Sequence, residues 1–474
     1  MSLNSVYTNE YLDIISALSG DAEGQNSSVE YMQNSTAIVK NRVVEHSFMP
    51  RLYSQECYER FVYASETMHA ICEKVITHYL QTPAYREIFD FDPRLVELIL
   101  LPRGYDALLP FARVDIFLNE DTNTYKFCEL NADGSSGMNE DREIFNSIKR
   151  SESFRSFSEK HKVQTSNLFQ PWVRDFIEIY STYEHKRENP HFAICDYLQN
   201  AVVNEFEIYA QAFKDAGFDC SVYDVRDLRF NGEELIAPDG KRVDAIWRRC
   251  VTNDVLEFWD ESQDLLDAVR NEKVALIGSF AGHIVHDKQI FQKFFHEETK
   301  AILCCEELDF LEKSVPRTRF LSHDQVDINE IISNKDNYII KPTDAYGSKD
   351  VFTGCMSDDK EWSQIVNEYI CDLSEQSNFL VQDYCVPFKT LITPPLTHMN
   401  IIDSMDEKTA NISLNNKPIF TASYNNLSGL YLYNGKFQGV FSRLGPFPSI
   451  NKMLHGITAA TVWVDCDLAD NVAK

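Results

Sequence analysis

The sequence predicts a mixed α/β (α+β) protein, and three stretches of the chain with different periodicities support this prediction. Residues 58–80 place apolar side chains near helical spacing, and residues 113–131 alternate polar and apolar side chains as strands do. Residues 188–282 place strand-like and helix-like runs in turn, an order typical of a small open α/β unit.

Length and composition restrict the class of protein. The 474 residues are 44% hydrophobic and 12% aromatic, which is enough for sizeable cores in one large domain or in two to three smaller ones. The net charge of −28 argues against a nucleic-acid partner. No apolar run is long enough for a membrane helix, and no signal peptide is visible. The twelve scattered cysteines read as reduced thiols, so we expect a cytoplasmic protein.

A polar stretch at residues 185–190 predicts one domain boundary, and a change in pattern near residue 283 predicts another. The predicted parts are a helical part with a hairpin (1–187), an α/β unit (188–282) and a third part (283–474).

In the first part we expect a helix that begins near residue 55 and ends at Pro83. In the second we expect a helix at 205–216 that closes at Gly217, among strands at 191–195, 219–223, 242–247 and 274–278.

The third part is predicted to hold a helix at 288–297 and strands at 338–340 and 378–382. Its final hundred residues, rich in Asn, Gly and aromatic side chains, favour antiparallel β structure.

The hairpin carries the first candidate site. Arg113 and Asp115 share one face of its first strand, and Glu129 and Asn131 share one face of its second. Folding about the turn formers at 121–123 places Asp115 opposite Glu129 and Arg113 opposite Asn131. Facing carboxylates repel unless a positive charge lies between them, and Asp, Glu and Asn oxygens suit Mg²⁺.

Residues 338–351 carry the second candidate site. An apolar strand leads into Lys341 and Pro342, and a loop with Gly347 and Ser348 follows. Backbone N–H groups and an ammonium group are one way to hold nucleotide phosphates. A strand-end lysine beside a turn is also common for structural reasons, and Lys288 could equally be a solvated helix lysine.

Taken together, these segments resemble the glutathionylspermidine synthase-like family of circularly permuted ATP-grasp ligases. The resemblance covers most of the chain in blocks around Arg113 and Asp115, 129–133, 244–249, 286–288, 306–319, 340–347 and 381–383. In ordinary ATP-grasp enzymes the phosphate-binding lysine precedes the metal block. Here Asn131 precedes Lys341 by 210 residues, as the permuted branch requires.

The resemblance implies a permuted ATP-grasp fold with an inserted small Rossmann-like pre-ATP-grasp unit. It also implies that ATP phosphorylates a carboxylate, after which an amine attacks the acyl phosphate to give an amide. Asp115, Glu129 and Asn131 would hold Mg²⁺, and Arg113 would be catalytic by stabilising the transferring phosphoryl group. The residues that would bind ATP are Lys288, Lys341, Gly347, Ser348 and Gln382.

The acceptor side of the site is less defined. The candidate substrate contacts are Asp133, Ser135, Ser136, Arg248, Arg249 and Arg443. The chain departs from the family at 132–137, at Arg317 and in its phosphate loop, where Asp350 adds negative charge. Glutathione and spermidine are therefore not carried over, and the small-molecule carboxylate and amine stay unnamed.

Two other functions remain open. The atypical phosphate loop also fits a nucleotide-binding protein without ligase activity, serving as a regulatory or scaffold module, and a small-molecule kinase is a third reading. His283 and His286 lie close together, but no Cys or His accompanies them at ligand spacing, which disfavours a metal site. The sequence does not indicate an oligomeric state.

Overall fold

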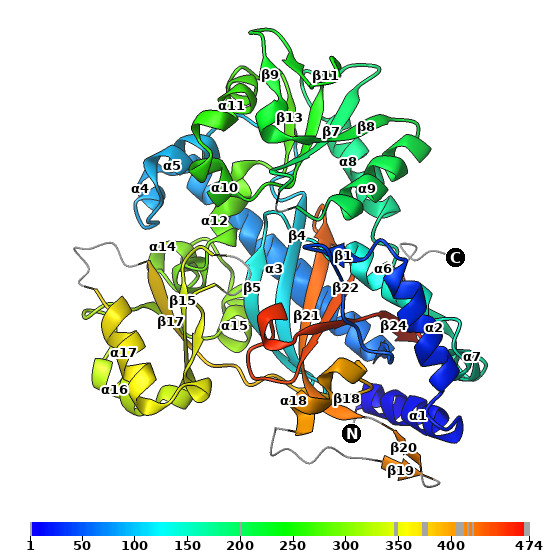
Figure 1. Cartoon of the computed structure of the whole chain (residues 1–474). Helices are drawn as coiled ribbons and strands as arrows, with labels where there is room; N and C mark the ends of the chain where they lie inside the picture. The colour runs from blue at the N-terminus through cyan, green and yellow to red at the C-terminus, as the bar shows by residue number, and fades with distance from the viewer. Residues whose placement is uncertain are drawn as a thin grey trace.

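The computed structural model describes residues 2–199, 201–345, 349–371, 378–403, 412–414, 417–419 and 421–468, with no side chains described for 402–420. It is a mixed α/β structure built from several sheets, as expected (Figure 1). Within the described residues, no helix combines the length and apolar character that a membrane span requires. The domain boundaries predicted from the sequence stay predictions.

A central antiparallel sheet brings the hairpin together with the C-terminal part of the chain. Its order is β23-β22-β21-β4-β5, and β18 also pairs with β21. Figure 1 shows the hairpin β4–β5 beside β21 and β22, with α3 (Gln55–Gln81) packed behind them. The strands are β4 (Phe111–Asn119), β5 (Thr124–Asn131), β18 (Lys389–Ile392), β21 (Ala422–Tyr433), β22 (Lys436–Gly445) and β23 (Ile457–Ala459).

The hairpin has the predicted register at its functional end. Arg113 pairs with Asn131, and Asp115 pairs with Glu129. Beyond Asp115 the register shifts by one residue, so that Ile116 pairs with Phe127 and Cys128 becomes the extra residue of a β-bulge. Strict alternation would turn Cys128 away from Glu129, but the bulge leaves both lining the same cleft.

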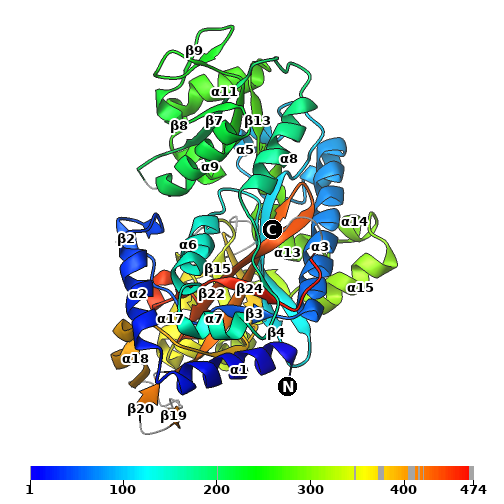
Figure 2. The same ribbon diagram turned by 90° about the vertical axis from the view of Figure 1, so that its right-hand side faces the viewer.

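A parallel four-stranded sheet forms the upper part of the molecule (Figures 1 and 2). Its order is β8-β7-β12-β13. The chain first adds β8 on one side of β7 and then adds β12 and β13 on the other side. The helix α9 (Val203–Asp215) connects β7 to β8 and is followed by Gly217 at φ +91°, as predicted. The other elements are β7 (His191–Asp196), β8 (Asp219–Asp224), β12 (Ala245–Arg248), β13 (Ala275–Ile277), α8 (Gln170–Ser181), α10 (Thr252–Glu257) and α11 (Gln263–Arg270).

A short three-stranded antiparallel sheet extends from the parallel one. It has the order β11-β10-β9, and the turn between β10 and β11 contains Gly240 at φ +84°. Its strands are β9 (Arg229–Phe230), β10 (Leu235–Ile236) and β11 (Arg242–Val243).

A third sheet carries the predicted phosphate-binding strand. Its order is β14-β17-β15-β16, all antiparallel, and a small core that includes Trp362 joins it to its helices. The elements are β14 (Thr318–Phe320), β15 (Tyr338–Pro342), β16 (Phe352–Thr353), β17 (Phe379–Asp383), α16 (Ile328–Ser333) and α17 (Asp359–Tyr369).

The remaining elements surround these sheets. β24 (Thr461–Val464) lies between β3 (Arg51–Tyr53) and β6 (Val163–Gln164), while β1 (Ile38–Val39) and β2 (Arg42–Val43), and β19 (Ile412–Leu414) and β20 (Lys417–Ile419), form separate pairs. The helices are α1 (Leu3–Ala17), α2 (Ala22–Gln33), α4 (Pro83–Arg86), α5 (Pro93–Ile99), α6 (Met138–Ile148), α7 (Glu152–Ser158), α14 (Glu297–Lys300), α15 (Cys305–Ser314) and α18 (Met399–Asp403).

The single helix predicted at 288–297 is not present, so this prediction was wrong in its extent. The chain there forms short turns, α12 (His283–His286) and α13 (Ile290–Lys293), with Lys288 in the break between them. The carboxylate of Asp287 accepts a hydrogen bond from the N–H of Gln289 at 2.8 Å. This local bond competes with helical hydrogen bonding and interrupts the helix.

Candidate functional site

A cleft between the hairpin and the β15–β17 sheet brings together most of the predicted nucleotide and metal residues. The predicted residues that line it are Asp115, Glu129, Lys288, Lys341, Gln382 and Arg443. Apolar side chains line it as well, among them Phe117, Ile339, Val351 and Leu427. The cleft therefore combines charged groups with an apolar wall, the composition that small-ligand sites usually have.

Arg113 and Asp115 form a buried bidentate pair on β4. The guanidinium donates to the two carboxylate oxygens at 2.7 and 3.0 Å, and it also donates to the backbone oxygen of Ser136 at 3.1 Å. Phe441 lies beneath the guanidinium at 5.4 Å. Burial raises the pKa of Asp115, and the charge of Arg113 offsets only part of that rise.

Glu129 and Lys288 form a second ion pair, at 2.9 Å, that connects β5 with the break between α12 and α13. Lys288 also donates to the backbone oxygen of Ala345 at 2.9 Å, where the phosphate loop begins. Burial alone would raise the pKa of Glu129, but the charge and hydrogen bond of Lys288, together with the charges of His286 and Lys341, outweigh it and the pKa falls to about 2. The glutamate is therefore ionised throughout the physiological pH range.

Lys341 lies across the cleft on β15 and is 5% exposed. It donates to Gln382 Oε1 at 2.8 Å and to the backbone oxygen of Cys128 at 3.2 Å. Gln382 is fixed in turn because its amide donates to Thr318 Oγ1 at 2.7 Å. Burial lowers the pKa of Lys341, and the nearby charge of Lys288 contributes to the same shift.

The residues predicted to hold Mg²⁺ fit a hard cation in their chemistry. Asp115 and Glu129 face each other across the β4–β5 ladder, and Asn131 follows on the same face of β5. Asn131 Nδ2 is buried and has no hydrogen-bond partner among the described residues. Each carboxylate keeps lone pairs beyond those used by Arg113 and Lys288, so the group offers the oxygen ligands that Mg²⁺ prefers.

Asp133 and Arg248, predicted as substrate contacts, form a buried ion pair with each other, and their remaining polar atoms are also hydrogen-bonded. Arg248 also donates to the backbone oxygens of Gly278 and Cys250, at 2.5 and 2.8 Å, and Asp133 accepts from the N–H of Thr252 at 3.0 Å. Burial raises the pKa of Asp133, but Arg248, His283 and His286 together outweigh that effect and hold the pKa well below its usual range. Contacts of this kind stabilise the fold, and the substrate role predicted for both residues stays a prediction.

Arg249 and the serines of the 135–136 segment form a cluster with unused hydrogen-bonding capacity. Arg249 is 2% exposed and donates through Nη2 to the backbone oxygen of Ser135 and, at 2.9 Å, to Ser136 Oγ. Its Nε and Nη1 atoms, and Ser135 Oγ, have no hydrogen-bond partner in the part of the chain that the structure describes. Trp247 stacks against the guanidinium at 4.7 Å.

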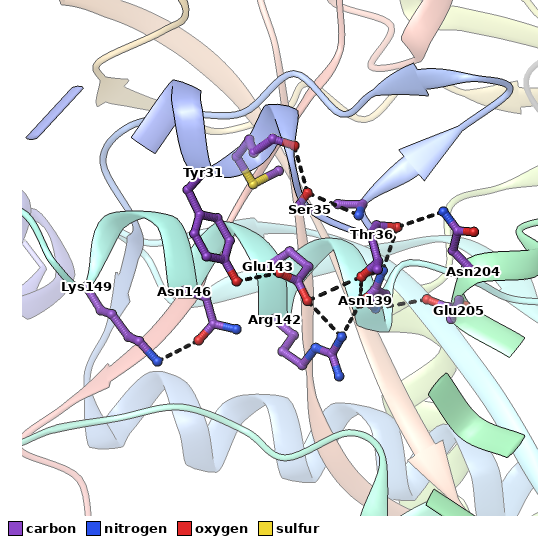
Figure 3. Close-up of polar contacts among 12 residues, drawn as sticks. Tyr31, Ser35, Thr36, Asn139, Arg142, Glu143, Asn146, Lys149, Asn204 and Glu205 are labelled. Atoms are coloured by element: carbon purple, nitrogen blue, oxygen red, sulfur yellow. Dashed lines mark hydrogen bonds and ion pairs between the residues drawn. The ribbon is translucent and has the colours of Figure 1, made fainter. Parts of the chain in front are cut away.

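The N-terminus of α6 holds this segment in place. Glu205 of α9 accepts from the N–H groups of Gly137 and Asn139, at 3.1 and 2.9 Å. Figure 3 shows Glu205 beside Asn139, in a network that continues through Thr36 and Glu143 to Tyr31 of α2. The network ties the N-terminal helices to the parallel-sheet region at the point where the serines lie.

The structure also brings His283, which the sequence disfavoured as a metal ligand, together with Asp344, which sequence reasoning missed. His283 lies 3.1 Å from Asp344 and 3.6 Å from Asp133, measured between ring nitrogens and carboxylate oxygens. Burial favours the neutral ring, but Asp344 and Asp133 outweigh it and raise the pKa of His283 to about 10. Sequence spacing carries no signal for this contact, because Asp344 lies 61 residues beyond His283.

Two predicted ATP contacts cannot be placed. Gly347 and Ser348 lie outside the described residues. The residues that flank them are described, and Ala345 lies within hydrogen-bonding distance of Lys288.

Comparisons with known proteins agree with the fold. A glutathione synthetase-like effector from Globodera pallida, in its apo form, aligns with a TM-score of 0.60 and 11% identity over 93% of this chain and 96% of that chain. A candidate γ-glutamylcysteine synthetase from Methylobacillus flagellatus KT aligns with a TM-score of 0.40 and 10% identity over 83% and 88%, too low to indicate a shared fold. No protein-family model and no curated protein sequence matches the chain. The chain therefore shares its α+β fold with the effector from Globodera pallida.

Proposed function

We propose that this protein is an ATP- and Mg²⁺-dependent ligase that joins a small-molecule carboxylate to an amine through an acyl phosphate. One observation carries the proposal. The acidic face of the β4–β5 hairpin meets two buried lysines from distant parts of the chain across one cleft, with Glu129 2.9 Å from Lys288. Opposed carboxylates and ammonium groups are what a metal-bound polyphosphate requires.

The internal ion pairs support this reading. Lys288 is paired with Glu129, and Lys341 is held by Gln382, so each buried ammonium group already has a partner. When phosphates bind, the two lysines would turn their donors to phosphate oxygens. The freed glutamate would then need a new cation, which a bound Mg²⁺ supplies while neutralising the phosphates.

Arg113 is the candidate catalytic residue. Its contact with the backbone oxygen of Ser136 places the guanidinium between the metal-binding face and the serine segment. A buried, permanently charged group at that position would stabilise negative charge on the transferring phosphoryl group and on the tetrahedral adduct. Positioning and charge stabilisation account for the rest of the reaction, since no nucleophile from the protein is required.

The unused donors of Arg249 are the best candidates for holding the substrate carboxylate. A buried guanidinium with two unpaired nitrogen atoms, Nε and Nη1, is costly unless an anion completes its hydrogen bonding. Ser135 Oγ, also unpaired, adds a further polar group beside it. Arg443 lines the cleft next to Asp115 and would serve either the nucleotide or the substrate.

The finer assignment follows the sequence resemblance. We place the protein in the circularly permuted ATP-grasp group, similar to glutathionylspermidine synthase, with the parallel-sheet region as its inserted pre-ATP-grasp unit. The pairing of β4 with strands near the C-terminus supports this order of segments.

The test is ADP release by the purified protein with pooled carboxylates and pooled amines. We expect release only when ATP, Mg²⁺, the correct acid and the correct amine are all present. Glu129→Ala should reduce this turnover at least about a hundredfold while the thermal unfolding midpoint stays close to that of the wild type. Unchanged turnover in the variant would refute the site assignment.

Two other outcomes would redirect the proposal. ATP binding in calorimetry without turnover across the panel would indicate a nucleotide-binding protein without ligase activity, the function that the atypical loop around Asp350 favours. A stable phosphorylated acid formed without any amine would indicate a kinase.

A further inference from the structure

A second cluster of potential metal ligands lies next to the nucleotide cleft and includes a histidine. His283, Asp287 and Asp344 each offer one ligand atom, and these atoms all lie within 4.8 Å of one another. They come from α12, from the residue that follows it and from the loop after β15. His283 and Asp287 are 1% and 4% exposed, and Asp344 is partly exposed, so two of the three ligands are buried and the third lies at the rim.

We propose that His283, Asp287 and Asp344 bind a divalent transition-metal ion, distinct from the Mg²⁺ expected at the hairpin. The inference does not rest on the proposed ligase activity, because each step below concerns the cluster alone.

The surroundings of His283 match those of a metal-binding histidine. Its Nε2 atom faces Asp344 at 3.1 Å, while its Nδ1 atom faces Asp133 at 3.6 Å, close to the carboxylate but without a hydrogen bond among the described residues. Metal-binding histidines commonly direct their second ring nitrogen to a carboxylate, which fixes the ring and strengthens it as a ligand. Asp133 is itself fixed by Arg248 and Thr252, so this supporting carboxylate is rigid.

The carboxylates of the cluster favour binding of a cation. Arg248 compensates Asp133, and Lys288 is paired with Glu129. Asp287 forms no ion pair with Lys or Arg in the described residues, and its recorded hydrogen bond comes from the N–H of Gln289. A protonated His283, 3.1 Å from Asp344, can balance only one of the two carboxylates of Asp287 and Asp344. One divalent ion bound to the neutral ring would balance both.

A second histidine gives an independent indication of a ligand. His286 is 7% exposed, and its Nδ1 atom has no hydrogen-bond partner among the described residues. Its ring centre lies 5.5 Å from that of His283. An unpaired buried nitrogen at this distance is available as a further ligand or as a donor to a bound water.

The ligand types select the class of metal. Imidazole favours Zn²⁺, Co²⁺ and related ions over Mg²⁺ and Ca²⁺, whereas the hairpin offers oxygen ligands alone. Two adjacent sites with different ligands would therefore hold different ions at once.

The test is a titration of the full chain, freed of metal by dialysis against a chelator and kept without ATP. Co²⁺ is followed by visible absorption and Zn²⁺ by calorimetry. We expect one equivalent of each to bind with excess Mg²⁺ present. His283→Gln and Asp287→Asn should each weaken binding by more than about tenfold.

Two control variants make the titration specific. His185→Gln alters the exposed cluster of Glu184, His185 and Glu272, which also has metal-like spacing, and it should bind as the wild type does. Glu129→Ala removes the proposed Mg²⁺ ligand and should also leave Co²⁺ binding unchanged. Thermal unfolding checks each variant, and Asp287→Asn decides the outcome if His283→Gln does not fold.

Three results would overturn the inference. The first is no binding to the wild type, which would leave His283 as an imidazolium held between two carboxylates. The second is wild-type affinity in Asp287→Asn. The third is loss of binding in Glu129→Ala, which would assign the ion to the nucleotide cleft.

Discussion

Two ion pairs, Asp133–Arg248 and Glu129–Lys288, differ in how much of their hydrogen-bonding capacity is used within the protein. In the Asp133–Arg248 cluster, both partners are 1% exposed at the side chain and the guanidinium donates to a carboxylate and to backbone oxygens. In the cleft, the side chain of Glu129 is 27% exposed, and its carboxylate keeps lone pairs beyond the one that contacts Lys288. Both clusters join a carboxylate to a cation, but the second is more exposed and keeps lone pairs that a ligand could use, which is what we expect of a binding site.

The strongest way to break this comparison is Arg248→Met. The change leaves Asp133 buried without its cation, so we expect unfolding to cost about 3–5 kcal/mol less than in the wild type, measured by urea denaturation. Arg226→Met is the matched control, because its bidentate pair with Asp224 is partly exposed and should cost at most about 1 kcal/mol. Equal losses in the two variants would contradict the structural role of Arg248.

Asp141 is a third buried carboxylate, and among the described residues it has no cationic partner. Asp141 is 3% exposed and accepts from the N–H of Thr461 at 2.8 Å, with no ion pair in the described residues. Burial raises its pKa to about 7. The folded-state pKa of Asp141 therefore lies above that of the unfolded chain. The contribution of Asp141 to stability is complete below about pH 4, where the carboxyl is protonated in both states, and is lost as pH rises through 7.

Asp141→Asn should remove that loss. At pH 8 we expect the variant to be more stable than the wild type by roughly 2–4 kcal/mol, with a much smaller difference at pH 4. Urea denaturation at both pH values measures it, with the exposed Asp13→Asn as control. Parallel pH profiles for the wild type and Asp141→Asn would show that Asp141 does not titrate as proposed.

Lys341→Met tests the cleft, where we expect a substitution to lower activity without lowering stability. Methionine fills a similar volume without the buried charge, so we expect ATP-dependent turnover to fall about a hundredfold while the unfolding midpoint stays equal or rises. Lys335→Met, just before the same strand, should leave turnover unchanged. A midpoint that falls along with turnover would assign Lys341 to the fold.

Arg249→Lys should give the smallest effect. Lysine keeps the positive charge but loses the two unpaired guanidinium donors, so we expect KM for the acid substrate to rise about tenfold with KM for ATP unchanged. Initial-rate kinetics with each substrate varied in turn measures both. Equal increases in the two KM values would indicate a general distortion of the site.

The sequence predicted the hairpin well because the information there is local. Alternation and turn residues determine which side chains share a face, and the Asp115–Glu129 pairing follows from them. The bulge at Cys128 was not visible, since a single extra residue leaves no mark on composition. The broken helix around Lys288 was missed because the side chain of Asp287 competes with the helical backbone.

Contacts between distant segments were harder to predict. The resemblance brought Lys288 and Lys341 to one site before the structure did, but residue type alone could not separate Arg248 from Arg249. The two are neighbours with the same side chain, yet one is saturated and the other retains unpaired N–H atoms. That difference depends on Gly278, Cys250 and the other groups that the fold places around them.

The pairing of β4 with β21 also matters during synthesis of the chain. One edge of β4 binds β5 at once, but its other partner is made about 300 residues later. At roughly 5–20 residues per second, this mostly buried strand waits about 15–60 s with an open edge on the ribosome. An unpaired, largely apolar edge is a template for aggregation, so this fold should depend on chaperones more than a fold whose neighbouring strands follow one another in the chain.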